Sequence, residues 1–144
     1  MTATVIQLLP KTKRLSKKAR AEAVTAAVAR WIDCFGLGEW VIYTQQAEYA
    51  LAEGSVATIS LNHAYLYATL LYGNDIEVYA DGGIEGAIRH EIVHVFLAPV
   101  LCAGDAIIDK SVSESIRKTV NATWEVAGEQ VTERLNRLLK KLED

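Results

Sequence analysis

The sequence predicts an α+β domain, and three features of the chain support this fold class. Apolar residues recur at helical spacing near the N-terminus, short β-branched and aromatic runs occupy the middle, and two more helical patterns follow. The chain has 144 residues, of which 51% are hydrophobic, and this length suits one hydrophobic core better than two. We therefore expect one domain over residues 1–144, with a flexible or extended segment at residues 1–15.

The first predicted element is an amphipathic helix. Its apolar residues recur at intervals of three and four from Lys17 to Phe35. Ser16 is a suitable N-cap, because a serine hydroxyl can accept a hydrogen bond from a free amide of the first turn. Gly36 predicts the end of the helix, since glycine readily adopts the left-handed conformation that follows many helices.

Short strands are predicted in the middle of the chain. Residues 40–44 and 55–61 are rich in β-branched and aromatic side chains, and the turn that ends at Gly54 indicates an antiparallel pair. Residues 64–72 could form a further strand or a short helix, and their aromatic content favours the strand. Residues 76–79 are typical of one more short strand. We expect a small, mostly antiparallel sheet with residues 55–61 at an exposed edge.

Two helices are predicted after the strands. The turn at residues 81–83 opens a helix from Ile84 to roughly Leu97, and Pro99 predicts its end because proline disfavours helical structure in the residue before it. The expected core stripe of this helix consists of Ile88, Ile92, Val95 and Phe96. Residues 101–110 are expected to form a loop. A long helix is then predicted from Ser113 to Leu142, with an apolar stripe at Val120, Trp124, Ala127, Val131, Leu135, Leu138 and Leu142.

Charge and composition exclude some function classes. The net charge of −3 argues against a general nucleic-acid binder, and the basic residues crowded into residues 11–20 are typical of a solvated surface. No apolar run approaches the ~20 residues that cross a bilayer, and the N-terminus does not resemble a signal peptide. We therefore expect a cytoplasmic protein that binds neither nucleic acid nor membrane. Cys34 and Cys102 are expected to be buried thiols.

The most informative motif is His-Glu-Ile-Val-His at residues 90–94, within a predicted helix. Two histidines four residues apart lie on one face of a helix and can bind one Zn²⁺, with the intervening Glu91 beside them as a general base. A catalytic zinc ion usually has three protein ligands and one position open to water. His90 and His94 would supply two of these ligands, so the third must come from another part of the chain.

Candidates for the third ligand lie on the predicted C-terminal helix. Glu129 and Glu133 are four residues apart, so Glu129 could bind the metal while Glu133 accepts a hydrogen bond from the far nitrogen of a ligand histidine. Glu125 has the same spacing from Glu129 and is the alternative ligand. We prefer Glu129, because Glu125 lies nearer the start of the apolar stripe. Gly128 would let the two helices approach closely, at a helix-propensity cost of ~1 kcal/mol.

These motifs resemble those of the zincin metallopeptidases, specifically the gluzincins, in which a Glu on a second helix is the third zinc ligand. The small size and the order of elements resemble minimal members of that group, including small proteins of phage and prophage genomes. The resemblance covers about residues 40–139 and implies a zincin-like fold. It also implies a zinc site formed by His90, His94 and Glu129, with Glu91 as general base and Glu133 as hydrogen-bond partner. The implied substrate is a peptide or protein, extended along the edge strand.

Other roles and other functions remain open. His63, Tyr65 or Tyr67 could stabilise an oxyanion, as an additional domain does in larger gluzincins, although such residues are more often rim or solvated side chains. One alternative function is a zincin fold that binds zinc in a structural or regulatory role with little peptidase activity. The other is a non-enzymatic α+β module that binds another protein. The sequence does not predict an oligomeric state.

Overall fold

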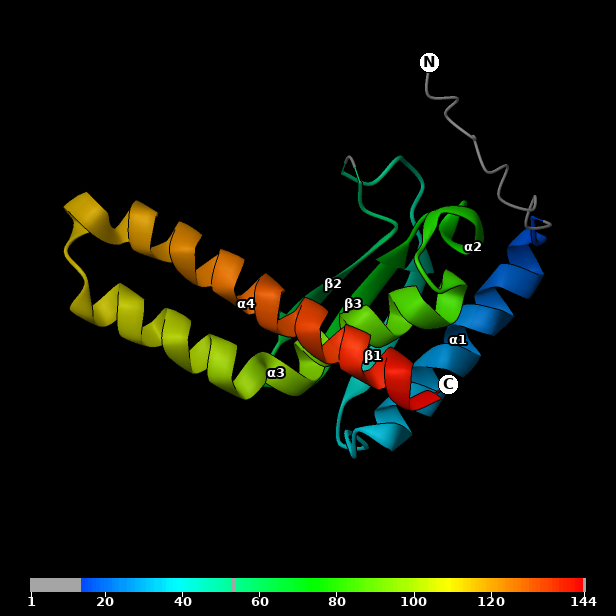
Figure 1. Ribbon diagram of the computed structural model, residues 1–144, viewed down its shortest axis with the longest axis horizontal. Coiled ribbons are helices and arrows are strands. Elements are labelled where there is room, and N and C mark those ends of the chain that lie inside the picture. The colour runs from blue at the N-terminus through cyan, green and yellow to red at the C-terminus, as the bar shows by residue number, and fades with distance from the viewer. Residues whose placement is uncertain (1–13, 53, 144) are drawn as a thin grey trace, which may run out of the picture.

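The computed structural model describes residues 14–143 except residue 53, and the expected N-terminal segment 1–15 therefore lies largely outside the described residues. The elements are α1 (Lys17–Cys34), β1 (Val41–Gln46), β2 (Ala57–Asn62), β3 (Tyr67–Tyr72), α2 (Ile76–Tyr79), α3 (Gly83–Ser111) and α4 (Glu114–Glu143). Helix α1 and the first part of α3 lie beside the small sheet, whereas α3 and α4 form a hairpin that extends away from it (Figure 1). This arrangement confirms the predicted α+β class.

Helix α1 begins and ends where the sequence predicts. The hydroxyl of Ser16 accepts a hydrogen bond from the backbone amide of Ala19 at 3.1 Å. Gly36 has a φ of +65°, which is the left-handed conformation expected after the helix. The apolar stripe of α1 packs into the core through Val24, Ala27, Val28 and Trp31.

The three strands form a mixed sheet with the order β1-β3-β2. The predicted antiparallel pairing of the first two strands is wrong, because β3 lies between them, parallel to β1 and antiparallel to β2. The strand reading of residues 64–72 is confirmed. Its side chains explain the central position, since Ala68, Leu70 and Tyr72 are buried. The prediction that residues 55–61 form an edge strand is also confirmed by β2.

Residues 76–79 form the short helix α2, so the prediction of a strand there is wrong. The amides of Val78 and Tyr79 donate to the carbonyl of Asp75, and these local bonds close a helical turn directly after the preceding Gly73–Asp75 turn. The buried side chains of Ile76 and Glu77 point into the protein from the same turn. The packing of Ile76 and the ion pair between Glu77 and Arg20 of α1 therefore outweigh the β-propensity of this short segment.

Helix α3 continues through Pro99 to Ser111, so the predicted helix end and the loop at residues 101–110 are both wrong. An interior proline removes one backbone hydrogen bond, but packing of this part of α3 along α4 compensates for the loss. The ring of Trp124 on α4 lies directly against Gly104 of α3. Phe96 was expected in the core stripe, yet it is 46% exposed and contacts Phe35 at the surface.

The predicted long C-terminal helix is confirmed by α4, but much of its apolar stripe is not covered. Val131, Leu138 and Leu142 are 45%, 53% and 75% exposed, and Gly128 and Thr132 are the buried residues of α4. Contact with α3 along a narrow line through Gly128 and Thr132 explains why α4 buries so little.

The cysteine prediction is confirmed in part. Cys34 and Cys102 are free thiols as expected, but the prediction that both are buried is wrong, because Cys34 is exposed and Cys102 is half-buried.

One described helix, α3, is long and apolar enough to cross a membrane by length and composition. Its most apolar 18-residue window has a mean hydropathy of 1.8, so the expectation that no apolar stretch reaches this length does not hold. Helices in the core of globular proteins pass the same test. Ile92, Val95 and Ala98 of α3 are fully buried in the protein core, and 33% of the apolar window is buried.

A buried ion pair joins α1 to α2. The guanidinium of Arg20 donates to both carboxylate oxygens of Glu77, at 2.8 and 2.7 Å, and the amide of Leu15 donates to the same carboxylate at 3.0 Å. The hydrogen bond from Arg20 is the main reason that the pKa of Glu77 falls to about 2. Because both side chains are only 7% exposed, removal of one partner would leave an unpaired buried charge.

Replacement of Glu77 by glutamine should reduce the free energy of unfolding by about 3 kcal/mol at pH 7. The folded-state pKa of Glu77 is about 2, against an ordinary value of 4.5, so its stabilising effect is present above pH 4.5 and is lost as the pH falls toward 2. The difference between wild type and Glu77→Gln should therefore shrink over this range. Urea denaturation at a series of pH values measures it.

Glu22→Gln is the matched control, because Glu22 forms only an exposed pair with Lys18 at 3.9 Å. This variant should differ little from wild type at any pH. If the difference in unfolding free energy between wild type and Glu77→Gln stays constant between pH 4.5 and 2, the role assigned to the charge of Glu77 is contradicted.

Candidate metal centre

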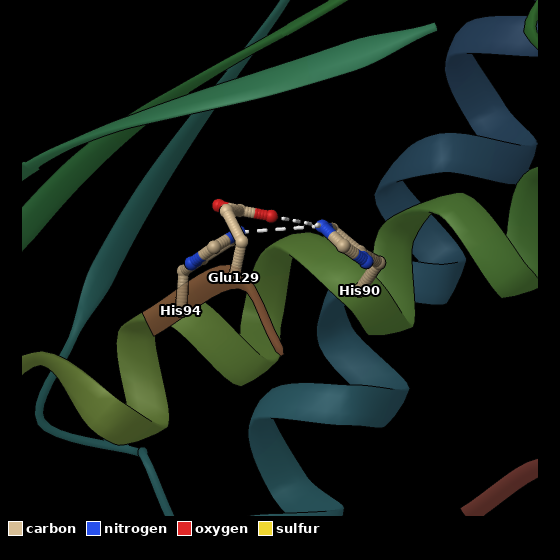
Figure 2. Close-up of side chains that lie close together, drawn as sticks. All are labelled: His90, His94 and Glu129. Atoms are coloured by element: carbon tan, nitrogen blue, oxygen red, sulfur yellow. Dashed lines mark hydrogen bonds and ion pairs between the residues drawn. The ribbon is translucent and has the colours of Figure 1, made fainter. Parts of the chain in front are cut away.

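Helix α3 places the two histidines of the motif on the face that meets α4. Ile88 and Ile92 on the same helix are fully buried, and this fixes the rotation of α3 about its axis. The side chains of His90 and His94 are 21% and 17% exposed and point toward Glu129 of α4 (Figure 2). The site is therefore built from a core helix and the helix that packs across it.

Three ligand atoms converge between the helices. The Nε2 atoms of His90 and His94 are 3.3 Å apart, and Oε1 of Glu129 lies 3.3 Å from Nε2 of His94. The other oxygen of Glu129 lies 3.8 Å from Nε2 of His90. A carboxylate and two imidazole nitrogens at these separations could hold a metal ion.

Neighbouring side chains hold the far nitrogens of both histidines. Nδ1 of His90 lies 2.9 Å from Oε1 of Glu133, which accepts a hydrogen bond from it. The hydroxyl of Thr132 donates to the carbonyl of Gly128 at 3.0 Å, so its oxygen is free to accept from Nδ1 of His94 at 3.5 Å. With the proton on Nδ1 in both rings, both Nε2 lone pairs point at one position, an arrangement that a cation stabilises.

The donor set fits zinc in both chemistry and spacing. Two imidazoles and one carboxylate form a typical set of three ligands for a zinc ion with an open position. Zinc–ligand bonds of about 2.0–2.1 Å in a tetrahedron place the ligand atoms roughly 3.3 Å apart. Two separations of 3.3 Å, between the Nε2 atoms of the two histidines and between Nε2 of His94 and Oε1 of Glu129, agree with this value. The 3.8 Å separation from Nε2 of His90 belongs to the other oxygen of Glu129, so this carboxylate would need to adjust to bind the ion through one oxygen.

The protonation of His94 is also suited to a metal ligand. Burial is the main cause that lowers the pKa of His94 below its ordinary value of 6.5, and the neighbouring His90 lowers it further. These effects outweigh the carboxylate of Glu129, which raises the pKa. The imidazole of His94 is therefore neutral at physiological pH, which is the form that binds a metal.

Glu91 lies beside the ligands in a largely dry position. Its carboxyl is 8% exposed, and burial raises its pKa to about 7, with a further increase from the negative charge of Glu129. The backbone amide of Ile59 on β2 acts in the opposite direction. Glu91 on α3 and Glu129 on α4 line the same cleft.

A cleft of about 400 Å³ runs between β2 and the metal-binding group. The carbonyl of Val56 accepts from Gly73 at the start of the β2–β3 pairing, so by alternation the backbone groups of Ala57, Ile59 and Leu61 face away from β3. These three residues line the cleft together with His90, Glu91, His94 and Glu129. The edge of β2 that pairs with no other strand therefore lies opposite the histidines.

The structure brings together some of the predicted site residues and separates others. His90, His94 and Glu129 form the three-residue group, Glu91 lies beside it, and Glu133 contacts His90 as expected. Glu125 lies outside this group and lines an adjoining cavity. His63, Tyr65 and Tyr67 do not line the cleft among the described residues. Tyr67 accepts a hydrogen bond from Asn62, and His63 packs beside Trp40.

Thr132 is a site residue that the sequence analysis missed. Its fully buried side chain lies between Glu129 and Glu133 in the chain and contacts the second histidine. The available signal was a threonine at the i+4 position from Gly128, on the face that the two glutamates define. Threonine has no characteristic spacing for this role, so periodicity alone does not distinguish it from an ordinary helix residue.

Comparisons with models of known protein families, with curated proteins and with solved structures find no match to this chain. The evidence for a metal site is therefore its own geometry. That evidence consists of three convergent ligand atoms and the side chains that hold both histidine rings.

Glu129→Ala should lower the affinity for zinc by more than about 100-fold, because it removes one of three ligands, whereas loss of an outer partner typically costs 10–100-fold. Glu125→Ala removes the same charge from the same helix and should leave the affinity within a few-fold of wild type. Competition with a fluorescent chelator measures both affinities. Loss of zinc in Glu125→Ala with retention in Glu129→Ala would reverse the ligand assignment.

Thr132→Val should weaken zinc binding by roughly 10-fold, because the far nitrogen of His94 loses the hydroxyl that orients it. Thr123→Val is the matched control on the same helix, since the hydroxyl of Thr123 bonds only to the carbonyl of Thr119. The same competition assay compares the two variants. Equal zinc affinities in the two variants would show that Thr132 does not orient the ligand.

Proposed function

We propose that this protein is a zinc-dependent peptidase, with His90, His94 and Glu129 as metal ligands and Glu91 as general base. The observation that carries this proposal is the convergence of the three ligand atoms beside a shielded carboxyl group, in a cleft open to a free strand edge. A site that only stored or transported zinc would need neither the adjacent carboxyl nor the strand edge. Peptide hydrolysis uses both.

The residues of the site have distinct tasks in this reaction. A zinc ion supplies Lewis-acid chemistry, which makes water more acidic and polarises a peptide carbonyl. The carboxylate of Glu91 takes the proton from the attacking water and later delivers it to the leaving amine. Glu133 and Thr132 keep the histidine rings oriented, and they stay away from the reacting atoms.

The strand edge provides the binding surface for the substrate. An extended peptide can pair with the outward backbone groups of Leu61 and the carbonyl of Ile59, as an added strand of the sheet. The amide of Ile59 bonds to Glu91 and the carbonyl of Ala57 accepts from Ser55, so these two groups are already engaged. Backbone pairing of this kind holds a peptide without regard to most of its side chains. It would place the peptide chain in the same cleft as Glu91 and the two histidines.

A zinc-binding role with little peptidase activity is the second candidate, and one observation favours it. Among the described residues, the side chains expected to stabilise an oxyanion, His63, Tyr65 and Tyr67, do not line the cleft. Such donors typically contribute about 2.7–4 kcal/mol to lowering the barrier of acyl-transfer reactions. A peptidase without them would depend on the metal for this stabilisation and would turn over slowly.

Glu91→Gln should abolish turnover and retain zinc, because the amide cannot accept the proton of water while the three ligands are unchanged. Zinc content is measured by elemental analysis of protein purified without added metal. Cleavage is measured by mass spectrometry of a mixed peptide library. A chelator should stop cleavage by the wild type.

Glu39→Gln is the control, since this exposed residue lies outside the cleft. The outcomes separate the candidate functions. Equal cleavage by Glu91→Gln and wild type would contradict the general-base assignment. Bound zinc without cleavage of any peptide would favour the structural or regulatory role, and protein without zinc would favour a non-enzymatic module.

A further inference from the structure

A second cavity adjoins the metal-binding group on the hairpin of α3 and α4. Its volume is about 340 Å³, and its lining includes His94, Leu101, Asp105, Trp124, Glu125 and Glu129. His94 and Glu129 also line the cleft under β2, so the two spaces meet at the metal ligands. A substrate held in the cleft would thus have one side chain close to this cavity.

Two glycines lie against the apolar side chains that line the cavity. A Cβ atom at Gly104 would lie 2.0 Å from a ring atom of Trp124, so this indole packs directly on the backbone of α3. A Cβ atom at Gly128 would lie 3.3 Å from the side chain of Leu101. Neither glycine has the positive φ that a turn would require. Their lack of side chains lets Leu101 and Trp124 form a fixed apolar floor.

The rim of the cavity carries negative charge without a basic partner. Asp105 and Glu125 are exposed, and within the part of the chain that the structure describes neither takes part in an ion pair. Glu133, farther along α4, differs because it contacts both His90 and Arg137. Among residues 14–143 without 53, no lysine or arginine lines the cavity. Apolar side chains together with two unpaired carboxylates suit a ligand side chain that has an aliphatic stem and a positively charged end.

We propose that this cavity binds a lysine or arginine side chain of the peptide substrate, next to the bond that is cleaved. The proposal rests on the proposed peptidase function and adds its substrate class. The methylene groups of the basic side chain would contact Leu101 and Trp124, and its charge would contact Asp105 and Glu125. An acidic side chain would be repelled by the same carboxylates, so the cavity selects against it as well.

Peptide hydroxamates provide a test that does not require turnover, because the hydroxamate binds zinc and places its neighbouring residue at the cavity. The residue next to the hydroxamate is lysine, norleucine or glutamate. In one series of compounds the hydroxamate is attached on the N-terminal side of this residue, and in the other series on its C-terminal side. Calorimetry with zinc-loaded protein measures the affinities. In one series, the lysine compound should bind at least 10-fold more tightly than the norleucine compound, and the glutamate compound should bind most weakly.

The double variant Asp105→Asn, Glu125→Gln should bind the lysine compound only as tightly as the norleucine compound. Its affinity for the norleucine compound should equal that of the wild type. Asp109→Asn with Glu114→Gln is the matched control, because it removes the same charge near the end of the hairpin, outside the cavity. This control should retain the preference for lysine. Retention of the preference in the first double variant, or its loss in the control, would overturn the assignment of the cavity.

Failure of this inference is distinguishable from failure of the proposed function. Protein that binds zinc and binds all three hydroxamates equally has the metal centre but lacks a cavity for basic side chains. Zinc content reports on the metal centre alone, and the norleucine-hydroxamate affinity reports on the metal centre together with the apolar part of the cavity. The lysine-to-norleucine ratio reports on the cavity alone, and a ratio near one in both series overturns the proposal.

Discussion

The close contact between α3 and α4 is the interaction on which the candidate site depends. Each helix alone carries an incomplete set of groups, since the imidazoles belong to α3 and the carboxylate ligand belongs to α4. The register between the helices is fixed on both sides of the ligands. Gly128 lies against Leu101 on one side, and buried Arg89 donates to Asn136 at 2.7 Å and pairs with Glu143 on the other. A shift of one turn would separate the ligands by about 5 Å.

The chemistry of the site follows from the same contact. Burial against α4 and the sheet keeps His94 neutral and raises the pKa of Glu91, while Glu133 and Thr132 satisfy the outer nitrogens of the rings. The inner nitrogens then have acceptor character only, and they face a carboxylate. Such a cluster repels itself in the absence of a cation. The capacity of this group to hold a metal ion is thus a property of the whole packing arrangement.

The sequence predicted those parts of the site and fold that depend on local spacing. His90, His94, Glu129 and Glu133 lie on helices, and residues four apart share a face whatever the rest of the chain does. Strand order depends on contacts distant in sequence, so the central position of β3 could not be predicted from the run of strands. The continuation of α3 through Pro99 failed for a related reason, because packing with α4 overrides a local helix-breaking signal.

The two halves of the site also differ in how firmly the protein holds them. The histidines belong to a helix whose Ile88, Ile92 and Val95 are fully buried, whereas α4 buries little besides Gly128 and Thr132. Local stability follows buried apolar contact, so α4 is the element that opens at the lower free-energy cost. A metal that binds ligands from both helices favours the closed arrangement by its binding free energy, since separation of the helices breaks the site. Binding of a metal to this group would therefore be coupled to the docking of α4.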